Sequence, residues 1–252
     1  MGILRKLLGL DRPSARALGR QGESSTAVSI DWNNYWACDG RLLRNVYVPR
    51  DSGSTSEIDV LYITRKGLFV LEVKNYSGLI LGREQDRNWV QLLNAGRSWF
   101  GRRKYRKYSF FNPIRQNQLH IDALSGFLDL DIPIFSVVVF SDRCDLSRVE
   151  LSSEDLILCQ LEDLPGEIRF LWRTHADELT ETQVNRIYQR LQPLTHPDRH
   201  TRKAHIRSAQ AQRTAQGICP LCGARLVRRT SRTGHPFLGC TNYPNCHYTQ
   251  DL

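Results

Sequence analysis

The chain has 252 residues, enough for one medium-sized domain and a small second unit, and it carries a formal net charge of +9. It contains no run of 18 or more apolar residues, so no membrane-spanning helix is predicted. Residues 193–252 hold nine Lys or Arg against two Asp, a net +7, which leaves +2 for residues 1–192. This basic C-terminal part predicts a polyanionic partner.

The seven cysteines are unevenly placed: Cys38, Cys144 and Cys159 are isolated, and the other four cluster near the C-terminus. An odd number with scattered members argues against a disulfide framework and for a reducing compartment, so a cytoplasmic location is expected. The first ten residues are basic and apolar, but they are too short for a secretory signal and lack a small-residue cleavage site. We expect a helical N-terminus there and no membrane partner.

The N-terminal third begins with a predicted helix over residues 11–29, interrupted by small residues. Glu23 is a lone acid on the far side of this helix, and by itself it is expected to be an ordinary surface residue. Residues 41–50 read as a strand that ends at Pro49, and the polar residues 51–56 read as a loop.

Residues 57–74 predict a β-hairpin, because two runs rich in β-branched and aromatic residues flank the short loop 64–67, which contains a glycine. If those four residues form the loop, Ile63 lies opposite Leu68 in an antiparallel ladder. Side chains alternate between the two faces of a strand, so one face of this hairpin is apolar and is expected to face the core.

The same register places Asp59 opposite Glu72 and Glu57 opposite Lys74, with all four side chains on the other face of the hairpin. Two facing carboxylates repel each other, and a divalent cation with oxygen ligands would compensate for that repulsion. Lys74 beside such a metal would stabilise an attacking hydroxide or a phosphate oxygen. The alternative is an exposed hairpin with a solvated polar face.

After the hairpin, residues 79–81 and 89–93 predict two further strands, and residues 97–108 hold six basic residues interleaved with four aromatics. Such a segment suits a nucleic-acid groove, because cations meet phosphates and rings stack on unpaired bases. The alternative is a solvated loop. The candidate contacts within the segment are Arg102, Arg103, Lys104, Arg106 and Lys107.

A helix is predicted to begin at Pro113 with Asn112 as its N-cap, and Gln116 lies in its first turn. Its apolar residues at 114, 121, 124, 127 and 128 predict the side that packs inward. Later elements are a buried strand at 132–140, a strand at 155–159, helices at 162–172 and 178–191, and a linker or exposed helix at 193–216.

The C-terminal cysteines form two pairs separated by seventeen residues. Two cysteine pairs on tight turns can deliver four thiolates tetrahedrally to Zn²⁺. Such a small unit has little core, so the metal is expected to supply most of its folding energy, and a four-thiolate site is structural because it leaves no open position. The predicted zinc ligands are Cys219, Cys222, Cys240 and Cys246.

Residues 219–252 resemble the four-cysteine zinc ribbon at the C-terminus of bacterial type I DNA topoisomerases, and the match continues through Phe237-Leu-Gly-Cys240 and Asn242-Tyr-Pro244. The resemblance implies DNA binding, mainly of single strands. It does not imply topoisomerase activity, because the chain has no room for strand-passage domains and their tyrosine nucleophile. The DNA contacts expected in the ribbon are Arg225, Arg228, Arg229, Arg232, Phe237 and Tyr243.

Residues 17–130 resemble the nuclease-related domain (NERD) of the PD-(D/E)xK nuclease superfamily through Gly22-Glu23, Ile58-Asp59, the run from Gly67 to Asn75, and Asn112-Pro113 with Gln116. The resemblance implies that Asp59 and Glu72 hold a catalytic Mg²⁺ or Mn²⁺ and that Lys74 assists the nucleophile. It further implies that Glu23 completes the acidic cluster and that Gln116 approaches from the later helix. Glu57 is not part of the shared pattern.

The expected fold is α/β, with a mixed central sheet of the restriction-endonuclease type flanked by helices, plus a small zinc ribbon. The expected boundaries are an N-terminal segment at 1–16, a nuclease-like core at 17–130, its completing strands and helices at 131–192, a basic linker at 193–216 and the ribbon at 217–252.

The expected function is a metal-dependent DNA endonuclease or nickase in DNA processing or repair. One alternative is a non-catalytic DNA-binding accessory protein that keeps the nuclease fold as a scaffold, since fold does not dictate function. A weaker alternative takes RNA as the substrate, because phosphate contacts are alike in both.

Overall fold

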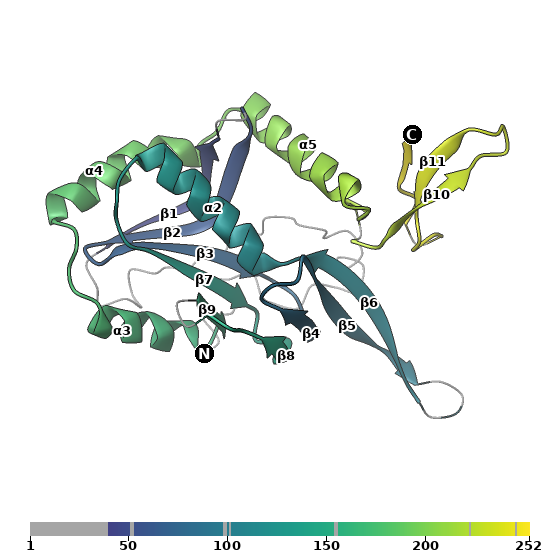
Figure 1. Ribbon diagram of the computed structural model, residues 1–252, viewed down its shortest axis with the longest axis horizontal. Helices are drawn as coiled ribbons and strands as arrows, with labels where there is room; N and C mark the ends of the chain where they lie inside the picture. Colours follow the sequence, from purple (N-terminus) through teal and green to yellow (C-terminus); the bar gives the residue numbers. More distant parts are fainter. Residues whose placement is uncertain are drawn as a thin grey trace. The chain divides into compact units, whose positions relative to one another are not determined.

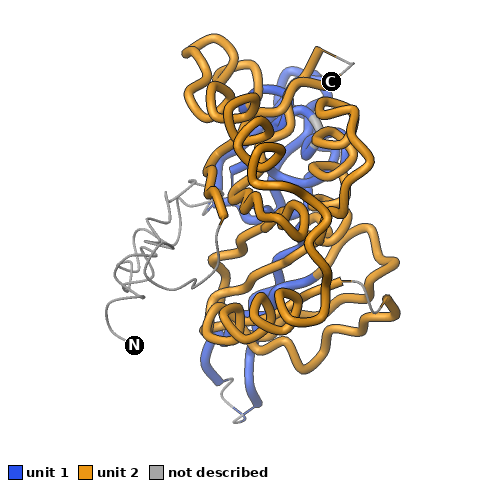
Figure 2. The backbone as a smooth tube through the Cα atoms, turned by 90° about the vertical axis from the view of Figure 1, so that its left-hand side faces the viewer, with its two compact units in different colours: residues 1–30, 90–110, 206–252 blue, residues 31–89, 111–205 orange. Residues whose placement is uncertain are grey.

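The computed structural model describes residues 40–50, 53–97, 100, 102–153, 156–221, 223–244 and 246–252. The chain divides into two compact units, coloured in Figure 2: residues 31–89 and 111–205 form one, and residues 1–30, 90–110 and 206–252 form the other. Each is described by itself below. None of the helices in the described part is long and apolar enough to cross a membrane.

The first unit is built on a five-stranded mixed sheet with the order β1-β2-β3-β7-β9 (Figure 1). The strands β1, β2 and β3 pair antiparallel, whereas β7 pairs parallel to both β3 and β9. The predicted α/β class with a mixed sheet is therefore confirmed. The strands are β1 (Gly40–Pro49), β2 (Thr55–Thr64), β3 (Gly67–Lys74), β7 (Ile134–Phe140) and β9 (Leu156–Gln160).

The β2–β3 hairpin has the predicted register, with Ile63 opposite Leu68. Gly67 closes the turn with φ +134°, and a β-carbon there would collide with the backbone carbonyl of Pro133. The pairing runs only as far as Val60 opposite Leu71, so the predicted continuation to the acidic residues is absent from the ladder. The two strands part where the polar residues begin.

The alternation of side chains between the two faces of the sheet is interrupted in β1 at Asn45 and in β2 at Asp59. Asn45 has a left-handed backbone (φ 49°), and neither residue appears in the otherwise continuous register between the two strands. Members of the main core are two residues apart in a regular strand, but here Ile58 is followed by Leu61, three positions later. The strands therefore rotate at this point, which changes the face on which the next side chains lie.

Two helices cover the face of the sheet that carries the main core. Helix α2 (Pro113–Leu128) contacts β1, β2, β3 and β7, and α4 (Glu181–Leu191) contacts β1 and β2 (Figure 1). The predicted N-cap is confirmed, because the Asn112 side chain accepts a hydrogen bond from the Ile114 backbone. Helix α3 (Leu164–Thr174) contacts β9, and the short η2 (Gln192–Thr195) follows α4.

A second sheet has the order β6-β5-β4-β8. The parallel pair β4–β8 was not anticipated, because the segment that forms β8 is short and its alternation is broken at Ser147 and Arg148. The segment with six basic residues forms the end of one strand and most of another. The strands are β4 (Gly78–Arg83), β5 (Asn88–Arg97), β6 (Arg103–Phe111) and β8 (Cys144–Glu150).

The segment expected to be a linker or exposed helix contains α5 (Arg199–Ala215). At its start, His205 contacts Tyr47 edge-on and lies within hydrogen-bonding distance of Thr55, so this end of the helix packs on β1 and β2. The C-terminal residues form a three-stranded antiparallel sheet of order β10-β11-β12. These strands are β10 (Leu226–Thr230), β11 (Pro236–Cys240) and β12 (Thr249–Asp251).

Candidate metal centres

The centre of the first candidate site is a buried ion pair between Glu72 and Lys74 at the end of β3. Lys74 Nζ lies 2.7 Å from Glu72 Oε1 and donates a hydrogen bond of 2.9 Å to Gln116 Oε1 on α2. Burial alone would raise the pKa of Glu72, but the ammonium of Lys74 and the neighbouring His120 together outweigh it and lower that pKa. The structure thus joins three of the residues that the sequence predicted for one site.

Asp59 lies at the irregularity of β2, where the β2–β3 ladder has ended. Its Oδ2 accepts a hydrogen bond of 2.9 Å from the Val73 backbone, so the side chain takes the place of the missing ladder partner. Burial, followed by the negative charge of Glu72, raises the pKa of Asp59 to about 8. A cation beside these two carboxylates would remove the electrostatic part of that cost.

Two further polar side chains of α2 reach the same region and were missed by the sequence reading. The buried residues of the helix are Pro113, Asn117, His120, Leu124 and Leu128. Asn117 donates hydrogen bonds of 2.9 Å to the Val70 carbonyl and to Ser136 Oγ, which ties the helix to β3 and β7. Asn117, His120, Leu124 and Leu128 follow one another at steps of three, four and four residues, and this helical spacing is the signal that would have found the two polar residues.

His120 connects the helix to both β2 and β3. Its Nδ1 lies 2.6 Å from Ser56 Oγ, and its Nε2 lies 3.2 Å from Glu72 Oε2. The second contact is not aligned for a hydrogen bond, and both Nε2 and Oε2 are buried without a hydrogen-bond partner. Because buried polar atoms are nearly always paired, these two atoms mark a place suited to a further group.

Glu57 belongs to a different cluster, so the prediction that it shares a face with Asp59 and Glu72 and lies opposite Lys74 is wrong. Its Oε1 accepts a hydrogen bond of 2.6 Å from Tyr47 Oη, and its Oε2 lies 3.3 Å from His205 Nε2. Burial would raise the pKa of Glu57, but these contacts with Tyr47 and His205, together with the nearby charge of Arg202, outweigh it and lower that pKa. The rotation of β2 at Asp59 is the physical reason for the separation.

Three of the four predicted zinc ligands converge in the C-terminal unit. The Sγ atoms of Cys219, Cys240 and Cys246 all lie within 4.8 Å of one another, and the three side chains are buried. Cys219 and Cys246 are 3.7 Å apart, and the Asn242 backbone donates to Cys240 Sγ at 3.4 Å. Cys222 lies outside the described residues. The described thiols thus have the arrangement of a structural zinc site.

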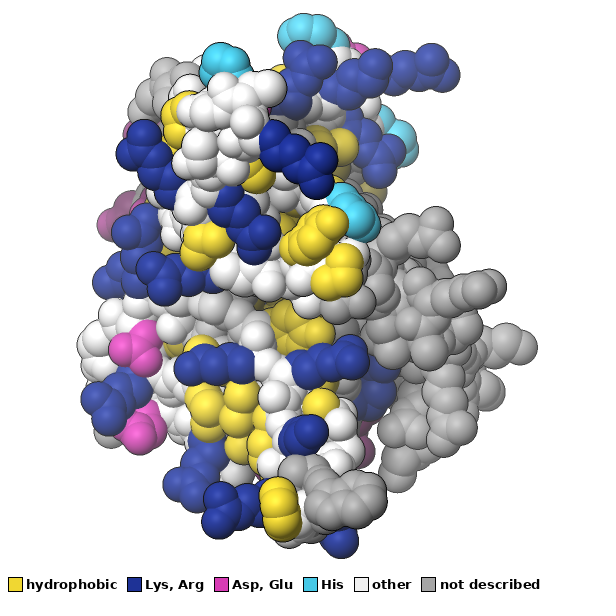
Figure 3. Space-filling model, turned by 90° about the vertical axis from the view of Figure 1, so that its right-hand side faces the viewer, with side chains coloured by type: hydrophobic (Ala, Val, Ile, Leu, Met, Phe, Trp, Pro, Cys, Tyr) yellow, Lys and Arg dark blue, Asp and Glu magenta, His cyan; other side chains and the backbone are white. Residues whose placement is uncertain are grey.

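The predicted nucleic-acid contacts are mostly exposed. Arg102 to Lys107 lie at the start of β6 and are exposed, as are the four predicted arginines of the ribbon and Tyr243, whereas Phe237 is partly buried. The face of the molecule in Figure 3 carries many Lys and Arg side chains and few acidic ones. Glu23, the predicted fourth acid, lies outside the described residues.

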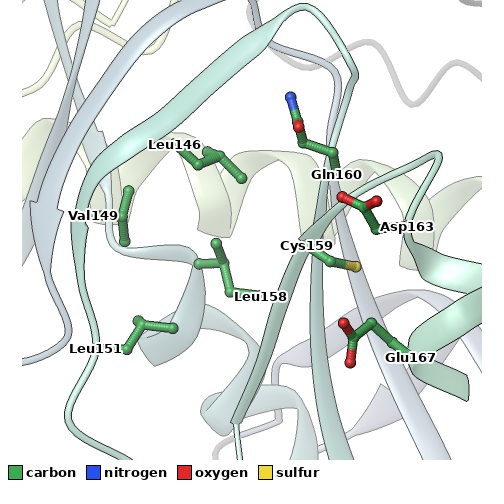
Figure 4. Close-up of a pocket in the computed structure, with 8 residues that line it drawn as sticks. All are labelled: Leu146, Val149, Leu151, Leu158, Cys159, Gln160, Asp163 and Glu167. Atoms are coloured by element: carbon green, nitrogen blue, oxygen red, sulfur yellow. The ribbon is translucent and has the colours of Figure 1, made fainter. Parts of the chain in front are cut away.

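A hollow of about 350 Å³ lies between β8, β9 and α3 (Figure 4). Leucines and a valine line one end of it, and Asp163 and Glu167 lie at the other end. The burial of Cys159 raises the pKa of its thiol to about 12, so this cysteine is an inert part of the wall. The hollow contains none of the predicted site residues.

Comparison with known proteins agrees with both parts of this description. The profile of the nuclease-related domain matches residues 18–141, and the profile of the topoisomerase DNA-binding C4 zinc finger matches residues 216–252. The uncharacterized protein pXO1-01 of Bacillus anthracis is 31% identical over 167 residues, which cover 66% of this chain and 72% of that protein. The chain belongs to the nuclease-related domain family.

The zinc ribbon has relatives of its own. DNA topoisomerase 1 of Archaeoglobus fulgidus is 53% identical over 36 residues, which are 14% of this chain and 5% of that protein. The uncharacterized protein YrdD of Escherichia coli K12 is 56% identical over 34 residues, 14% of this chain and 18% of that protein. The chain therefore spans only a small part of these two proteins. No solved structure matches the chain.

Proposed function

We propose that this protein is a metal-dependent DNA endonuclease or nickase whose zinc ribbon binds DNA. The observation that carries the proposal is the buried group of Asp59, Glu72 and Lys74, in which Asp59 has a pKa raised to about 8 and Glu72 Oε2 has no hydrogen-bond partner. A scaffold that buries two interacting carboxylates loses stability unless a cation compensates for their charge. The donor set therefore fits Mg²⁺ or Mn²⁺.

Asp59 and Glu72 would hold the cation, which when bound supplies a nucleophilic water and neutralises charge on the phosphate. Lys74 is fixed between Glu72 Oε1 and Gln116 Oε1, so its ammonium is held in one place. A positive charge fixed beside the carboxylates would stabilise the negative charge that develops on the phosphodiester in the transition state. Gln116 thereby acts as a positioning residue. Glu23 remains a proposed further acid of the site.

The zinc ribbon and the basic start of β6 support DNA as the polyanionic partner. The ribbon matches a family described as DNA-binding, and it carries exposed arginines, the exposed ring of Tyr243 and the partly buried Phe237, which lies opposite Arg229 in the β10–β11 pair. Exposed rings stack on unpaired bases, so we propose that the ribbon prefers single-stranded DNA. Binding by the ribbon would raise the effective concentration of DNA for the rest of the chain.

The test uses supercoiled plasmid and single-stranded DNA with Mg²⁺, Mn²⁺ or EDTA, and compares the wild-type protein with Glu72→Ala. Metal-dependent cleavage that the substitution abolishes, with DNA affinity changed less than about threefold, is the expected result. Equal loss of cleavage and binding would contradict the division of labour between the two parts. Replacing the DNA with RNA of the same sequence decides between the two substrates.

A second candidate function is a non-catalytic DNA-binding accessory protein. Within the described part of the chain, the cysteine cluster is the only group of three metal-ligating side chains whose donor atoms all lie within 4.8 Å of one another. This observation favours the accessory function, because the acidic group lacks such a tight triad. Zinc-dependent, salt-sensitive DNA binding with no cleavage in any metal would establish it.

A further inference from the structure

Two buried polar atoms of the acidic site face each other without a hydrogen bond. Glu72 and His120 are 2% and 7% exposed, and Oε2 of the first lies 3.2 Å from Nε2 of the second. Neither atom has another hydrogen-bond partner. Two ligands of one small cation typically lie about 3 Å apart, because each sits about 2.1 Å from the ion at a right angle. The spacing of this pair fits two ligands of one cation.

The other ring nitrogen of His120 is held in a way that favours this use of Nε2. Nδ1 lies 2.6 Å from Ser56 Oγ, and the same oxygen accepts a hydrogen bond of 2.9 Å from Arg50. If Nδ1 donates its proton to Ser56, Nε2 presents its lone pair toward Glu72. Histidines that bind metals almost always donate their other ring N–H to an oxygen in this manner.

The chain contains a second Glu–His pair of nearly the same length, which differs from the first in its exposure. Glu57 Oε2 and His205 Nε2 lie 3.3 Å apart, and these side chains are 20% and 18% exposed, against 2% and 9% for Glu72 and His120. The atoms of the second pair are not among the buried, unpartnered atoms of the described residues. Proximity of a histidine to a glutamate is therefore not the distinguishing feature; the burial of two unpaired atoms is.

We propose that His120 is a direct ligand of the catalytic cation, binding it through Nε2 together with Glu72 Oε2. Ser56 is a positioning residue that orients the ring. This inference rests on the proposed metal site but not on cleavage itself. Imidazole nitrogen suits Mn²⁺ and other transition metals better than Mg²⁺, which prefers oxygen ligands. His120 therefore sets a preference for Mn²⁺ over Mg²⁺.

The decisive measurement is the coordination of Mn²⁺ in the zinc-loaded, full-length protein. Electron spin echo spectroscopy of bound Mn²⁺ is expected to show coupling to a directly bound ¹⁴N, which changes to the ¹⁵N pattern when histidine is labelled with ¹⁵N. This experiment needs no substitution, so it does not depend on whether a variant folds. Bound Mn²⁺ without nitrogen coupling, or no binding of Mn²⁺ at all, overturns the proposal.

Substitutions assign the nitrogen to one residue. His120→Ala is expected to abolish the coupling and to weaken Mn²⁺ binding in calorimetry by more than about tenfold, with a smaller effect on Mg²⁺. His205→Ala is the matched control and is expected to retain both the nitrogen coupling and the Mn²⁺ affinity. If His205→Ala removes the coupling, the assignment to His120 is wrong. A nitrogen-coordinated Mn²⁺ in a protein that cleaves no nucleic acid would keep this proposal and reject the nuclease function.

Discussion

The two candidate metal centres of this chain differ in what holds them together. In the cysteine cluster, three thiols converge within 4.8 Å, and the apolar residues packed around them are few. In the acidic site, Glu72 already has an ammonium partner and Asp59 a backbone partner, and both lie on a sheet with a large core. The cysteine cluster therefore has little support apart from its ion. In the acidic site, the sheet and its core hold the side chains in place.

This difference has a thermodynamic meaning. A unit with little core depends on its metal for folding, so removing the ion removes the fold. A site carried by a sheet and two helices keeps its fold without the ion. The absence of the ion shows instead in the raised pKa of Asp59. The ribbon should therefore respond to metal as a folding reaction, and the acidic site as a binding reaction.

The largest effect is expected from loss of a zinc ligand. Structural zinc contributes about 10–16 kcal/mol of apparent binding free energy in small zinc-finger units, so Cys240→Ser should unfold the ribbon. Hydrogen exchange is expected to show loss of protection in residues 226–251 alone, together with a more than tenfold drop in affinity for a single-stranded oligonucleotide. Protection lost equally in β1 to β3 would contradict the comparison.

The next largest effect is expected from breaking the buried ion pair. Lys74→Met leaves Glu72 buried and unpaired, which should lower the free energy of unfolding by about 3–5 kcal/mol in urea denaturation. The double variant Lys74→Met/Glu72→Met removes both charges and should recover most of that loss. A double variant as unstable as the single one would show that the pair is not the source of the effect.

A pH dependence is expected at Asp59, whose pKa rises from its ordinary 3.8 to about 8 on folding. Without metal, this group contributes its full stability below pH 4 and loses it as the pH rises toward 8, because the unfolded carboxylate must then take up a proton in order to fold. Protons compete with a cation for the carboxylate, so Mg²⁺ affinity should rise about tenfold per pH unit up to pH 8.

Calorimetric titration with Mg²⁺ between pH 6 and pH 9 measures this dependence directly. Asp59→Asn removes the titrating group, so the variant should bind Mg²⁺ weakly with an almost flat pH profile. An unchanged slope in Asp59→Asn would assign the proton to another group.

The smallest effect is expected at Glu57, the glutamate of β2. Glu57→Gln keeps an acceptor for Tyr47 and lies in a partly exposed cluster, so it should change stability by less than about 1 kcal/mol. Cleavage should change less than about threefold. A loss of cleavage as large as that of Glu72→Ala would place Glu57 in the active site after all.

Much of the fold followed from local patterns. The hairpin register around Ile63 and Leu68, the Asn112 N-cap and the buried strand β7 were all predicted, because turn chemistry, capping and hydrophobic runs act over a few residues. The strand β8 was missed because it is short and its alternation is interrupted by the adjacent polar residues Ser147 and Arg148. The burial of His120 was missed because a polar residue on a helix is read as solvated unless the buried stripe is traced through it.

The sequence by itself determined the zinc ribbon, because four cysteines at short spacing need only local turns to meet at one ion. It also predicted one site for Glu72 and Lys74, which the structure joins in a buried ion pair. Only the tertiary structure decided which acids share a site: a left-handed residue at Asn45 and the rotation of β2 at Asp59 separate Glu57 from Glu72. The physical reason is that face alternation holds only while a strand is regular, and a single irregularity reassigns the side chains beyond it.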